Sequence, residues 1–495
     1  MVRYEDFGAV GDGVTNDYEA IYNAHEYANN TCQKVVATSG KTYYIGVSNG
    51  KCATIKTDTD WGDATFIIDD DIIPEDSEDN KLPLFKVASD YKTVQVSDDV
   101  ISAINARGGI EKNTEKIDTG LGYPAIIRIV NEKSMRYIRY GNDANNGRPQ
   151  LELLLVDENG CVDEQTPLVY DYEHVSYILA RRSDDTPITI SGGSFITKVS
   201  SLDRRRYYAR GISVSRNNVT MKNLDHKITG ECSNPLGPIY SGIVFVYDAA
   251  NVLIEDTYFQ AHKYYGAGTY DLLVEFSLNV TMRGCRQHNF YTDQGPLPCL
   301  YYGYWGIMGS NFSKNVVYEN CILTRFDAHA GLYNARISDS VLATISVTGG
   351  GTMIIENTEV IRHEFISLRG DFGSTFDGEI ILKNIRQNSH LPDKTRLISI
   401  TWKNHDFGYP CHHPNVTIDG YAVNVSEEIS FIEFRDNTVE HMDEAHLEVF
   451  KNGEKNNNPY YPPKRITIKN TSAVITIPNH EMYKDTEICG AKIAD

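Results

Sequence analysis

Clustered positive charge is scarce in this sequence. Its 495 residues contain 47 Lys and Arg against 67 Asp and Glu, which gives a formal net charge of -20. Nucleic-acid binding depends on Lys and Arg side chains that neutralise phosphates. We therefore expect no nucleic acid partner. A strongly polyanionic ligand is also disfavoured, but a local basic pocket on an acidic chain could still bind one.

Paired cysteines and long apolar runs are also missing. The nine cysteines are scattered and odd in number, with no Cys-x-x-Cys pair, so free thiols in a reducing compartment fit better than a disulfide framework. No segment is long and apolar enough to span a membrane. The opening residues MVRYEDFGAVGDG lack the basic-then-apolar profile of a signal peptide. We expect no membrane partner and a cytoplasmic location, or secretion if an export signal has been removed.

Tryptophan is rare, with 3 residues, whereas tyrosine is common, with 32. Tyrosine suits half-buried strands and also carbohydrate-facing grooves, and composition does not separate the two. Hydrophobic residues make up 41% of the chain, which is ordinary for a soluble globular protein. The length exceeds that of one compact domain but suits an elongated repeat fold.

The N-terminal segment carries a resemblance. Residues 6–17 read DFGAVGDGVTND, an amphipathic helix is predicted over 18–28, and VVATSGKTYYIG follows. This order resembles the opening of the pectate-lyase superfamily of right-handed parallel β-helix proteins. The resemblance implies an all-β solenoid with an N-terminal capping helix. A helix with one apolar face can cover the open end of a solenoid, and the expected apolar face consists of Ala20, Ile21, Ala24, Tyr27 and Ala28.

The pattern of strands and turns predicts four regions. We expect an N-terminal cap with the first coils over 1–71, an inserted β subdomain over 72–187, the main parallel β-helix over 188–478 and a C-terminal tail over 479–495. The insertion is predicted from an acidic exit loop near 70–79 and from strand-like runs at 125–130, 135–140 and 151–156, with a turn at 145–147.

Asn-Val pairs mark the repeat. Asn tolerates the left-handed conformation of a tight turn, and stacked Asn side chains can bond along the solenoid axis. Cys285 and Cys321 occupy the same place in successive coils, so they are expected to stack in the core as small hydrophobic side chains. The Asn-Val pairs begin at Asn218, Asn251, Asn279, Asn315 and Asn415.

The segment RFDAHAG, residues 325–331, is predicted to form a turn at one edge of the coils. Successive coils lie about 4.8 Å apart, so residues far apart in sequence become neighbours at that edge. An acidic cluster, a histidine, arginines and aromatic rings are expected to converge there, as suits a sugar. The candidate residues are Asp327, His329, Asp271 and Asp371 for catalysis, and Arg325, Arg369, Glu275, Tyr304, Trp305, Tyr333 and Arg336 for substrate binding. No cofactor and no metal are expected.

Two short motifs extend the resemblance to function. Phe326 to His329 read FDAH, which is similar to the FDPH motif of β-helix alginate epimerases, with Ala328 in place of the proline. Residues 304–310 resemble the strand that follows the Gly-His-Gly turn of polygalacturonase-type hydrolases, but the histidine is absent. Both resemblances imply a carbohydrate substrate and the same edge of the fold.

Two reactions fit these residues. In an inverting hydrolase, Asp327 would act as the acid and Asp271 or Asp371 as the base, with about 6.5–9.5 Å between the carboxyl groups. In a uronate lyase or epimerase, His329 or a tyrosine would remove a proton next to a carboxylate, and arginines would neutralise the resulting charge. We favour hydrolysis because carboxylates outnumber cations at the predicted edge.

Structural roles remain open for the same residues. Asp327 could cap a turn, and Arg369 with Asp371 could form a surface ion pair that contributes little to stability. The run Asp69–Asp71 is expected to be a solvated acidic loop rather than a calcium site. The chain could also be a non-catalytic, tailspike-like carbohydrate-binding β-helix. A homo-oligomer, either a trimer or a dimer, is a further expectation that the sequence leaves open.

Overall fold

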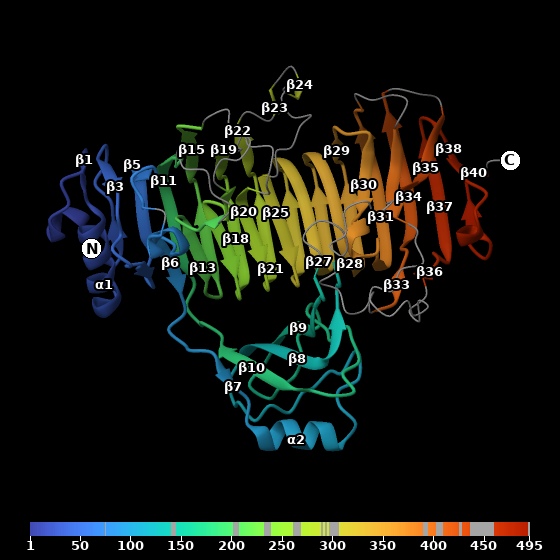
Figure 1. Cartoon of the computed structure of the whole chain (residues 1–495), viewed down its shortest axis with the longest axis horizontal. Coiled ribbons are helices and arrows are strands. Elements are labelled where there is room, and N and C mark those ends of the chain that lie inside the picture. Colours follow the sequence, from blue (N-terminus) through green and yellow to red (C-terminus); the bar gives the residue numbers. More distant parts are fainter. Residues whose placement is uncertain are drawn as a thin grey trace. The chain divides into compact units, whose positions relative to one another are not determined.

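The fold is a right-handed parallel β-helix, as the sequence predicted. The computed structural model describes residues 1–74, 76–139, 145–200, 207–231, 239–260, 269–288, 291–292, 295–296, 306–389, 395–401, 409–424, 428–435 and 460–493. Two compact units are present, and coils of parallel strands occur in both (Figure 1). Unit 1 comprises residues 1–91, 184–308 and 319–325, and unit 2 comprises residues 92–183, 309–318 and 326–495.

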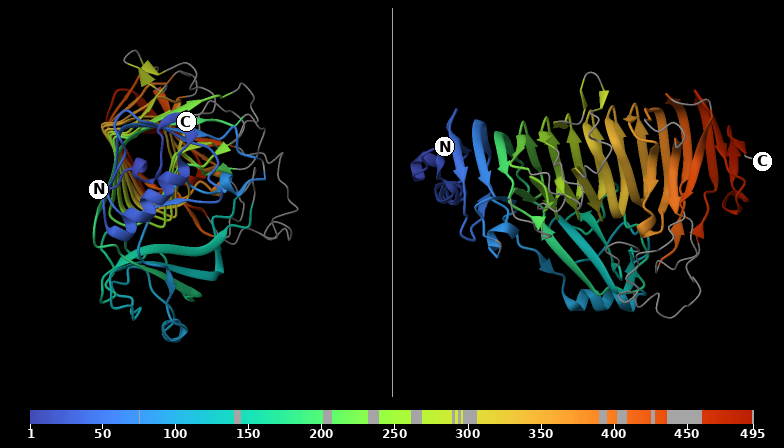
Figure 2. Two further views of the ribbon diagram at one scale, coloured as in Figure 1. Left: turned by 90° about the vertical axis from the view of Figure 1, so that its left-hand side faces the viewer. Right: turned by 45° about the horizontal axis from the view of Figure 1, so that its top comes forward.

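The predicted capping helix of unit 1 is confirmed as α1 (Tyr18–Thr31). The loop before it is held by Asp17, whose carboxylate accepts the backbone N–H groups of Val10 at 2.7 Å and Gly11 at 3.1 Å. The end-on view in Figure 2 shows α1 against the N-terminal end of the coils. The helix buries the predicted apolar face except Tyr27, which is exposed; that part of the prediction was wrong.

The described strands of unit 1 form parts of two large parallel sheets, a small parallel sheet of β12 and β16, and an antiparallel pair of β23 and β24. In the large sheets the side chains alternate between the interior and the outside. In β13, for example, Ile212 and Val214 point inward and Ser213 outward. The period of two places every second residue of a strand on the same side. The strands are β1 (Asp12–Asn16), β2 (Val35–Val36), β3 (Thr42–Ile45), β4 (Ala53–Ile55), β5 (Thr59–Asp69), β6 (Phe85–Ala88), β11 (Ile188–Lys198), β12 (Tyr207–Tyr208), β13 (Ile212–Ser215), β14 (Val219–Lys222), β15 (Asp225–Thr229), β16 (Ile239–Tyr240), β17 (Val244–Tyr247), β18 (Ala250–Glu255), β19 (Tyr258–Gln260), β20 (Tyr270–Glu275), β21 (Leu278–Arg283), β22 (Arg286–His288), β23 (Tyr291–Thr292) and β24 (Gly295–Pro296).

The asparagine ladder in unit 1 is confirmed. Asn218, Asn251 and Asn279 have φ values of 58°, 56° and 54°, in the left-handed region. The side-chain amide of Asn251 donates to Asn218 at 3.1 Å, and that of Asn279 donates to Asn251 at 2.9 Å. Cys285 and Cys321 are buried free thiols, as expected.

In unit 2 the ladder holds at one predicted position and fails at another. Asn315 has a φ of 58° and accepts a hydrogen bond from the Asn334 amide at 3.3 Å. Asn415 is not in the left-handed region. Its side-chain oxygen instead accepts the backbone N–H groups of Lys464 at 2.8 Å and Arg465 at 3.0 Å. Asn415 therefore joins two coils through the main chain.

The acidic run Asp69–Asp71 is not the solvated loop that we expected. Asp70 is fully buried and receives a hydrogen bond from Arg210 Nε at 2.6 Å. Burial raises the pKa of Asp70 to about 6, although the attraction of Arg210 acts in the opposite direction. The run contributes a buried ion pair to the core of unit 1.

The insertion in unit 2 is an antiparallel sheet in the order β7-β10-β8-β9 with one helix. The strands predicted near 125–130 and 151–156 are confirmed. The helix α2 was missed, although Ser97-Asp98-Asp99 before an apolar run is a helix-start signal; Ile101 packs it onto the sheet. The elements are β7 (Val94–Gln95), α2 (Asp98–Ala106), β8 (Ala125–Arg136), β9 (Arg148–Val156) and β10 (Tyr177–Arg182).

Some parallel strand pairs cross the boundaries that we predicted between the four regions. The boundaries themselves stay predictions. Although β6 falls within 72–187, it pairs in parallel with β4 and β13 of unit 1. Two strands of the expected tail, β39 and β40, pair in parallel with β37 and β38. In the described part of the chain, no helix combines the length and apolar character needed to cross a membrane. The remaining strands are β25 (Gly306–Asn311), β26 (Lys314–Glu319), β27 (Ile322–Ser338), β28 (Val341–Glu356), β29 (Glu359–Val360), β30 (Glu364–Leu368), β31 (Phe376–Gln387), β32 (Arg396–Thr401), β33 (Cys411–His412), β34 (Asn415–Val423), β35 (Glu428–Arg435), β36 (Tyr460–Tyr461), β37 (Arg465–Thr471), β38 (Val474–Ile477), β39 (Glu487–Cys489) and β40 (Lys492–Ile493).

Candidate functional site

Asp327 and His329 lie two residues apart in β27, so their side chains project from the same side of the strand. The His329 Nε2 and Asp327 Oδ2 atoms are 3.4 Å apart. The Asp327 side chain has no exposed surface, whereas 18% of the His329 side chain is exposed. The predicted turn over 325–331 was wrong, because β27 continues through it and the left-handed residue is Gly331, with a φ of 68°.

Arg369 joins Asp327 to Asp371. Its Nη1 donates to Asp327 Oδ1 at 3.2 Å and Oδ2 at 3.3 Å. Its Nε and Nη2 donate to the two oxygens of Asp371 at 3.1 and 2.7 Å. Arg369 follows β30 directly and precedes a 3-10 turn over 370–372, which brings Asp371 back toward the guanidinium. The structure therefore gathers Asp327 and Asp371 around the Arg369 guanidinium, with His329 beside Asp327.

The insertion supplies a fifth member of this group, which sequence reasoning missed. Arg139 follows β8, and its Nε lies 3.1 Å from Asp371 Oδ2. The backbone of Arg139 pairs with that of Asn145 in both directions, as in a hairpin. The Phe372 ring lies against His329, with ring centroids 6.4 Å apart, and within 6 Å of both guanidinium groups, at 5.7 Å for Arg369 and 5.8 Å for Arg139. We call Asp327, His329, Arg369, Asp371 and Arg139 the Asp-His-Arg cluster.

Charge is nearly balanced inside the Asp-His-Arg cluster. Burial would raise the pKa of Asp371, but Arg369, Arg139 and His329 together lower it below its usual range. Asp371 is therefore ionised near neutral pH, and its ion pairs with Arg369 and Arg139 fix the positions of both guanidinium groups. Among the described residues, no three His, Cys, Asp or Glu side chains come together as a metal site.

A buried ion pair fixes the insertion to the coils of unit 2. Lys314 in β26 donates to Glu152 of β9 at 2.8 Å and to the Pro167 carbonyl oxygen at 2.5 Å. Glu152 also accepts the backbone N–H groups of Val169 and Tyr170, both at 2.9 Å. Removing one partner of such a pair leaves an uncompensated buried charge. The insertion that carries Arg139 is therefore held in place by a polar contact with stringent geometry.

Three other predicted residues lie outside the Asp-His-Arg cluster. The half-buried ring of Tyr333 lies 5.8 Å from the Lys314 ammonium group. Arg336 forms an ion pair with Glu356 at 2.5 Å on the exposed side of β27. Arg325 is buried and is the last residue of its segment in unit 1. Their predicted contact with substrate stays a prediction.

Asp271 does not occupy the exposed edge that we expected. It is completely buried in unit 1, where Gln287 donates to its Oδ2 at 2.5 Å and in turn accepts the backbone N–H of Thr324. The amide of Gln287 thus ties β20 to neighbouring coils. Glu275 is partly exposed at the end of β20. The predicted pair Tyr304–Trp305 lies outside the described residues.

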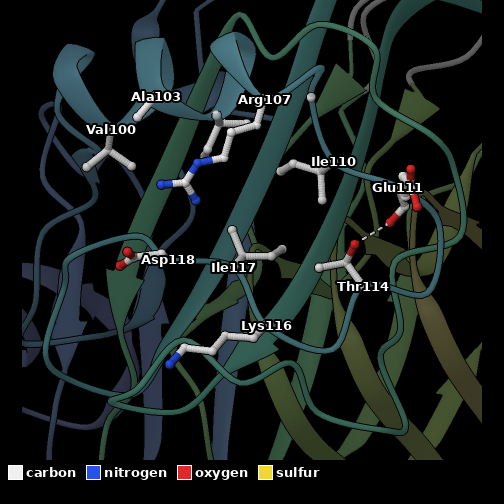
Figure 3. A pocket seen from close by; sticks show the side chains of 11 residues that line it. Val100, Ala103, Arg107, Ile110, Glu111, Thr114, Lys116, Ile117 and Asp118 are labelled. Carbon is white, nitrogen blue, oxygen red and sulfur yellow. Dashed lines mark hydrogen bonds between the residues drawn. The ribbon is translucent and has the colours of Figure 1, made fainter.

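A surface recess of about 300 Å³ lies within the insertion, between α2 and residues 109–118. Figure 3 shows the side chains of Arg107, which directly follows α2, and of Ile110, Ile117, Lys116 and Asp118 around this recess. None of the predicted site residues lines this recess. It is separate from the Asp-His-Arg cluster.

Comparison with known proteins supplies one relative in sequence. No protein-family model matches the chain. Over 136 residues it is 29% identical to the depolymerase, capsule KL64-specific, of Klebsiella phage P510. The match covers 25% of this chain and 12% of that protein, so the chain spans a small part of the curated relative.

Solved structures match over nearly the whole chain. The Gp54 tailspike of Acinetobacter baumannii bacteriophage AP22, solved in complex with A. baumannii capsular saccharide, is 10% identical with a TM-score of 0.53, over 99% of this chain and 79% of that one. The tailspike gp61 of Pseudomonas phage phi297 is 14% identical with a TM-score of 0.52, over 95% of this chain and 80% of that one. Identity this low establishes the fold alone. The chain has a right-handed parallel β-helix fold, and its likeness to these phage tailspikes is a likeness of fold.

Proposed function

We propose that this chain is a carbohydrate-active enzyme that cleaves glycosidic bonds of an acidic poly- or oligosaccharide, and that the Asp-His-Arg cluster is its active site. One observation carries the proposal: Arg369 holds the buried Asp327 carboxylate within 3.4 Å of His329, the imidazole that keeps exposed surface. A buried carboxylate behind an accessible imidazole is an arrangement that orients a general base.

The comparisons support the substrate class. A phage capsule depolymerase matches part of the sequence, and a tailspike with the same fold binds a capsular saccharide. A bacterial capsular polysaccharide is therefore the substrate that we propose. The two arginines of the cluster favour a saccharide that carries carboxylates, because guanidinium groups bind and neutralise them.

The geometry favours β-elimination. His329 would take the proton from carbon 5 of a uronate, and the Asp327 carboxylate would stabilise the imidazolium that forms. The electron pair of the broken C–H bond would form the C4=C5 double bond, and the C4–O bond would break with its electrons on the leaving oxygen. That oxygen would take a proton from water. Arg139 and Arg369 would offset the negative charge that develops at the sugar carboxylate.

Hydrolysis, the reaction favoured from the sequence, stays a second candidate. Asp371 supports it, because this carboxylate is ionised and 22% of its side chain is exposed, so it could activate water. Hydrolysis also needs a carboxyl group that holds a proton. Asp327, the predicted acid, has no exposed surface and points both oxygens at Arg369. Both oxygens are therefore engaged by Arg369 and do not face a leaving oxygen, which ranks hydrolysis second.

The test is a digestion of uronate-containing capsular polysaccharides, with reducing ends and the ultraviolet absorbance of an unsaturated uronate measured together. Both signals should rise in parallel. His329→Gln should lower the rate by about 10²- to 10⁴-fold, the usual contribution of a general base. Arg283→Gln, which alters exposed ion pairs with Glu255 and Glu319 outside the cluster, is the matched control and should keep the rate.

Each other outcome excludes part of the proposal. Reducing ends without absorbance would replace elimination by hydrolysis. A His329→Gln variant that cleaves at the wild-type rate would exclude the Asp-His-Arg cluster as the site. Saccharide binding without any cleavage would favour the non-catalytic, tailspike-like alternative.

A further inference from the structure

A pocket of about 320 Å³ opens on the outer face of the parallel sheet that contains β6, β13 and β17 in unit 1. The strand registers explain which side chains reach it. Lys86 of β6 pairs with Ser213 of β13, and Ser213 pairs with Phe245 of β17. Because all three point away from the core, they form one row across the floor of the pocket.

The floor ends in a partly exposed aromatic ring. Phe245 packs against Tyr270 and Leu273, which hold it in place, but it keeps exposed surface toward the pocket. An immobilised ring of this kind stacks well against the apolar face of a sugar. The hydroxyl groups of Ser213 and Ser241 line the same pocket and can bond to sugar hydroxyls.

Two ammonium groups give the pocket its charge preference. Lys86 is exposed, and none of the described carboxylates pairs with it. Lys81 contacts Glu78 at 2.7 Å, but that pair is largely exposed and therefore weak. Among the described residues that line the pocket, none is Asp or Glu. Positive charge concentrated in one recess of a chain with a net charge of -20 favours an anionic ligand.

We propose that this pocket binds one carboxylate-bearing sugar unit of a saccharide, with the ring on Phe245 and the carboxylate at Lys86 and Lys81, and that it does so without cleaving it. Cleavage is not part of the proposal, because the lining residues include no carboxylate and no imidazole for proton transfer. The proposal goes beyond the Asp-His-Arg cluster and stands even if that cluster proves inactive.

Cys52 lines the pocket and reports its occupancy. Burial raises the pKa of its thiol to about 11, so the thiol reacts slowly with alkylating agents and is not an activated nucleophile. The experiment alkylates the full chain with iodoacetamide at mildly alkaline pH and quantifies Cys52 by peptide mass spectrometry. The exposed Cys32 of the same unit is the internal reference. Sodium D-glucuronate, D-glucose and benzoate are the three probes.

Glucuronate should slow alkylation of Cys52 relative to Cys32, and glucose should protect much less. In Lys86→Gln, the concentration for half protection should rise by about tenfold, the loss expected for a hydrogen bond to a charged group. Lys34→Gln, which alters an exposed ion pair with Asp60, is the matched control and should leave protection unchanged. Ratios with and without probe are compared within each variant, because Lys86 itself affects the Cys52 thiol.

Equal alkylation with and without glucuronate would overturn the proposal. Glucose protecting as well as glucuronate, or benzoate protecting better, would also overturn it, since the pocket would then not select an anionic sugar. His329→Gln separates this proposal from the proposed function. Full protection of Cys52 in that variant supports an independent site, whereas loss of protection contradicts it.

Discussion

The guanidinium of Arg369 contacts two carboxylates through different edges. One side, Nε and Nη2, pairs with Asp371, and Nη1 meets both oxygens of Asp327. A lysine could not form this planar fork, so Arg369 sets the angle between the two carboxylates as well as their charge. Only 11% of its side chain is exposed. Its contribution to the Asp-His-Arg cluster is therefore the positioning of Asp327 behind His329.

Arg139 should set the acid limit of stability. Removing it in Arg139→Gln takes away one of the two arginines that lower the pKa of Asp371. That carboxylate contributes its ion pairs only above its pKa, and they are lost as the pH falls through it. The pKa should rise in the variant, so acid unfolding should have its midpoint at a higher pH than in the wild type.

The measurement is acid unfolding of the full chain, followed by circular dichroism from neutral to acidic pH, with Arg283→Gln, at an exposed ion pair with Glu319, as the control that should superimpose on the wild type. Identical midpoints for Arg139→Gln and the wild type would show that Arg139 does not act through Asp371.

The sequence identified part of the Asp-His-Arg cluster for a simple reason. Asp327 and His329 stand at a spacing of two in an extended segment, which puts them together whatever the coil does. Arg139 lies in the insertion, which a buried Lys314–Glu152 ion pair holds against the coils of unit 2. No local sequence pattern predicts such a contact. Asp271 was misplaced because an apolar strand does not reveal which of its polar residues turn inward.

At the scale of the element, the asparagine turns carry much of the coil geometry in unit 1. Asn251 is the middle member of its ladder and makes bonds to both neighbours. Its left-handed φ is unfavourable for most L-residues but not for glycine. Strain and side-chain bonding can therefore be separated by two substitutions at one position.

Asn251→Gly should lose the ladder bonds and keep the backbone, whereas Asn251→Ala should lose the bonds and become strained. We expect the local opening free energy to fall by about 1 kcal/mol in the glycine variant and about 2 kcal/mol in the alanine variant. Hydrogen–deuterium exchange of β18 and β21 measures it, and β34 and β37 of unit 2 serve as the internal reference. If both variants exchanged equally fast and faster than the wild type, the predicted contribution of backbone strain would be wrong. If both exchanged at the wild-type rate, the ladder bonds would not stabilise these coils.

Elements with strong periodicity were predicted well. Helix α1 and strands β8 and β9 have sustained patterns of apolar residues, and burial of those residues forms the element in each case. Helix α2 was missed because only Ile101 is fully buried among its nine residues, so its apolar face is short. The expected turn at 325–331 failed because the one left-handed residue of that segment, Gly331, lies within β27, which continues on both sides of it.

At the scale of the whole molecule, the fold could be predicted and the reaction could not. Repeated Asn turns and the N-terminal segment reflect backbone constraints that recur in several coils, so they are visible in a single sequence. The choice between elimination and hydrolysis depends on a few contacts of Asp327, His329 and Asp371, and a fold does not determine these. The expected oligomer and the cytoplasmic location stay predictions.

Net charge leads to a prediction about the entire chain. An acidic polysaccharide approaching a chain of net charge -20 is repelled at long range, while the cations of the Asp-His-Arg cluster act only at short range. The Debye length falls from about 30 Å at 0.01 M salt to about 8 Å at 0.15 M, so added salt removes repulsion before it weakens the buried contacts. We expect kcat/KM on the acidic polysaccharide to rise by about two- to fivefold over this range. The same polymer with its carboxyl groups reduced to alcohols should bind without this salt dependence. A kcat/KM that falls steadily from the lowest salt concentration would mean that local arginine attraction, rather than the charge of the whole chain, governs the encounter.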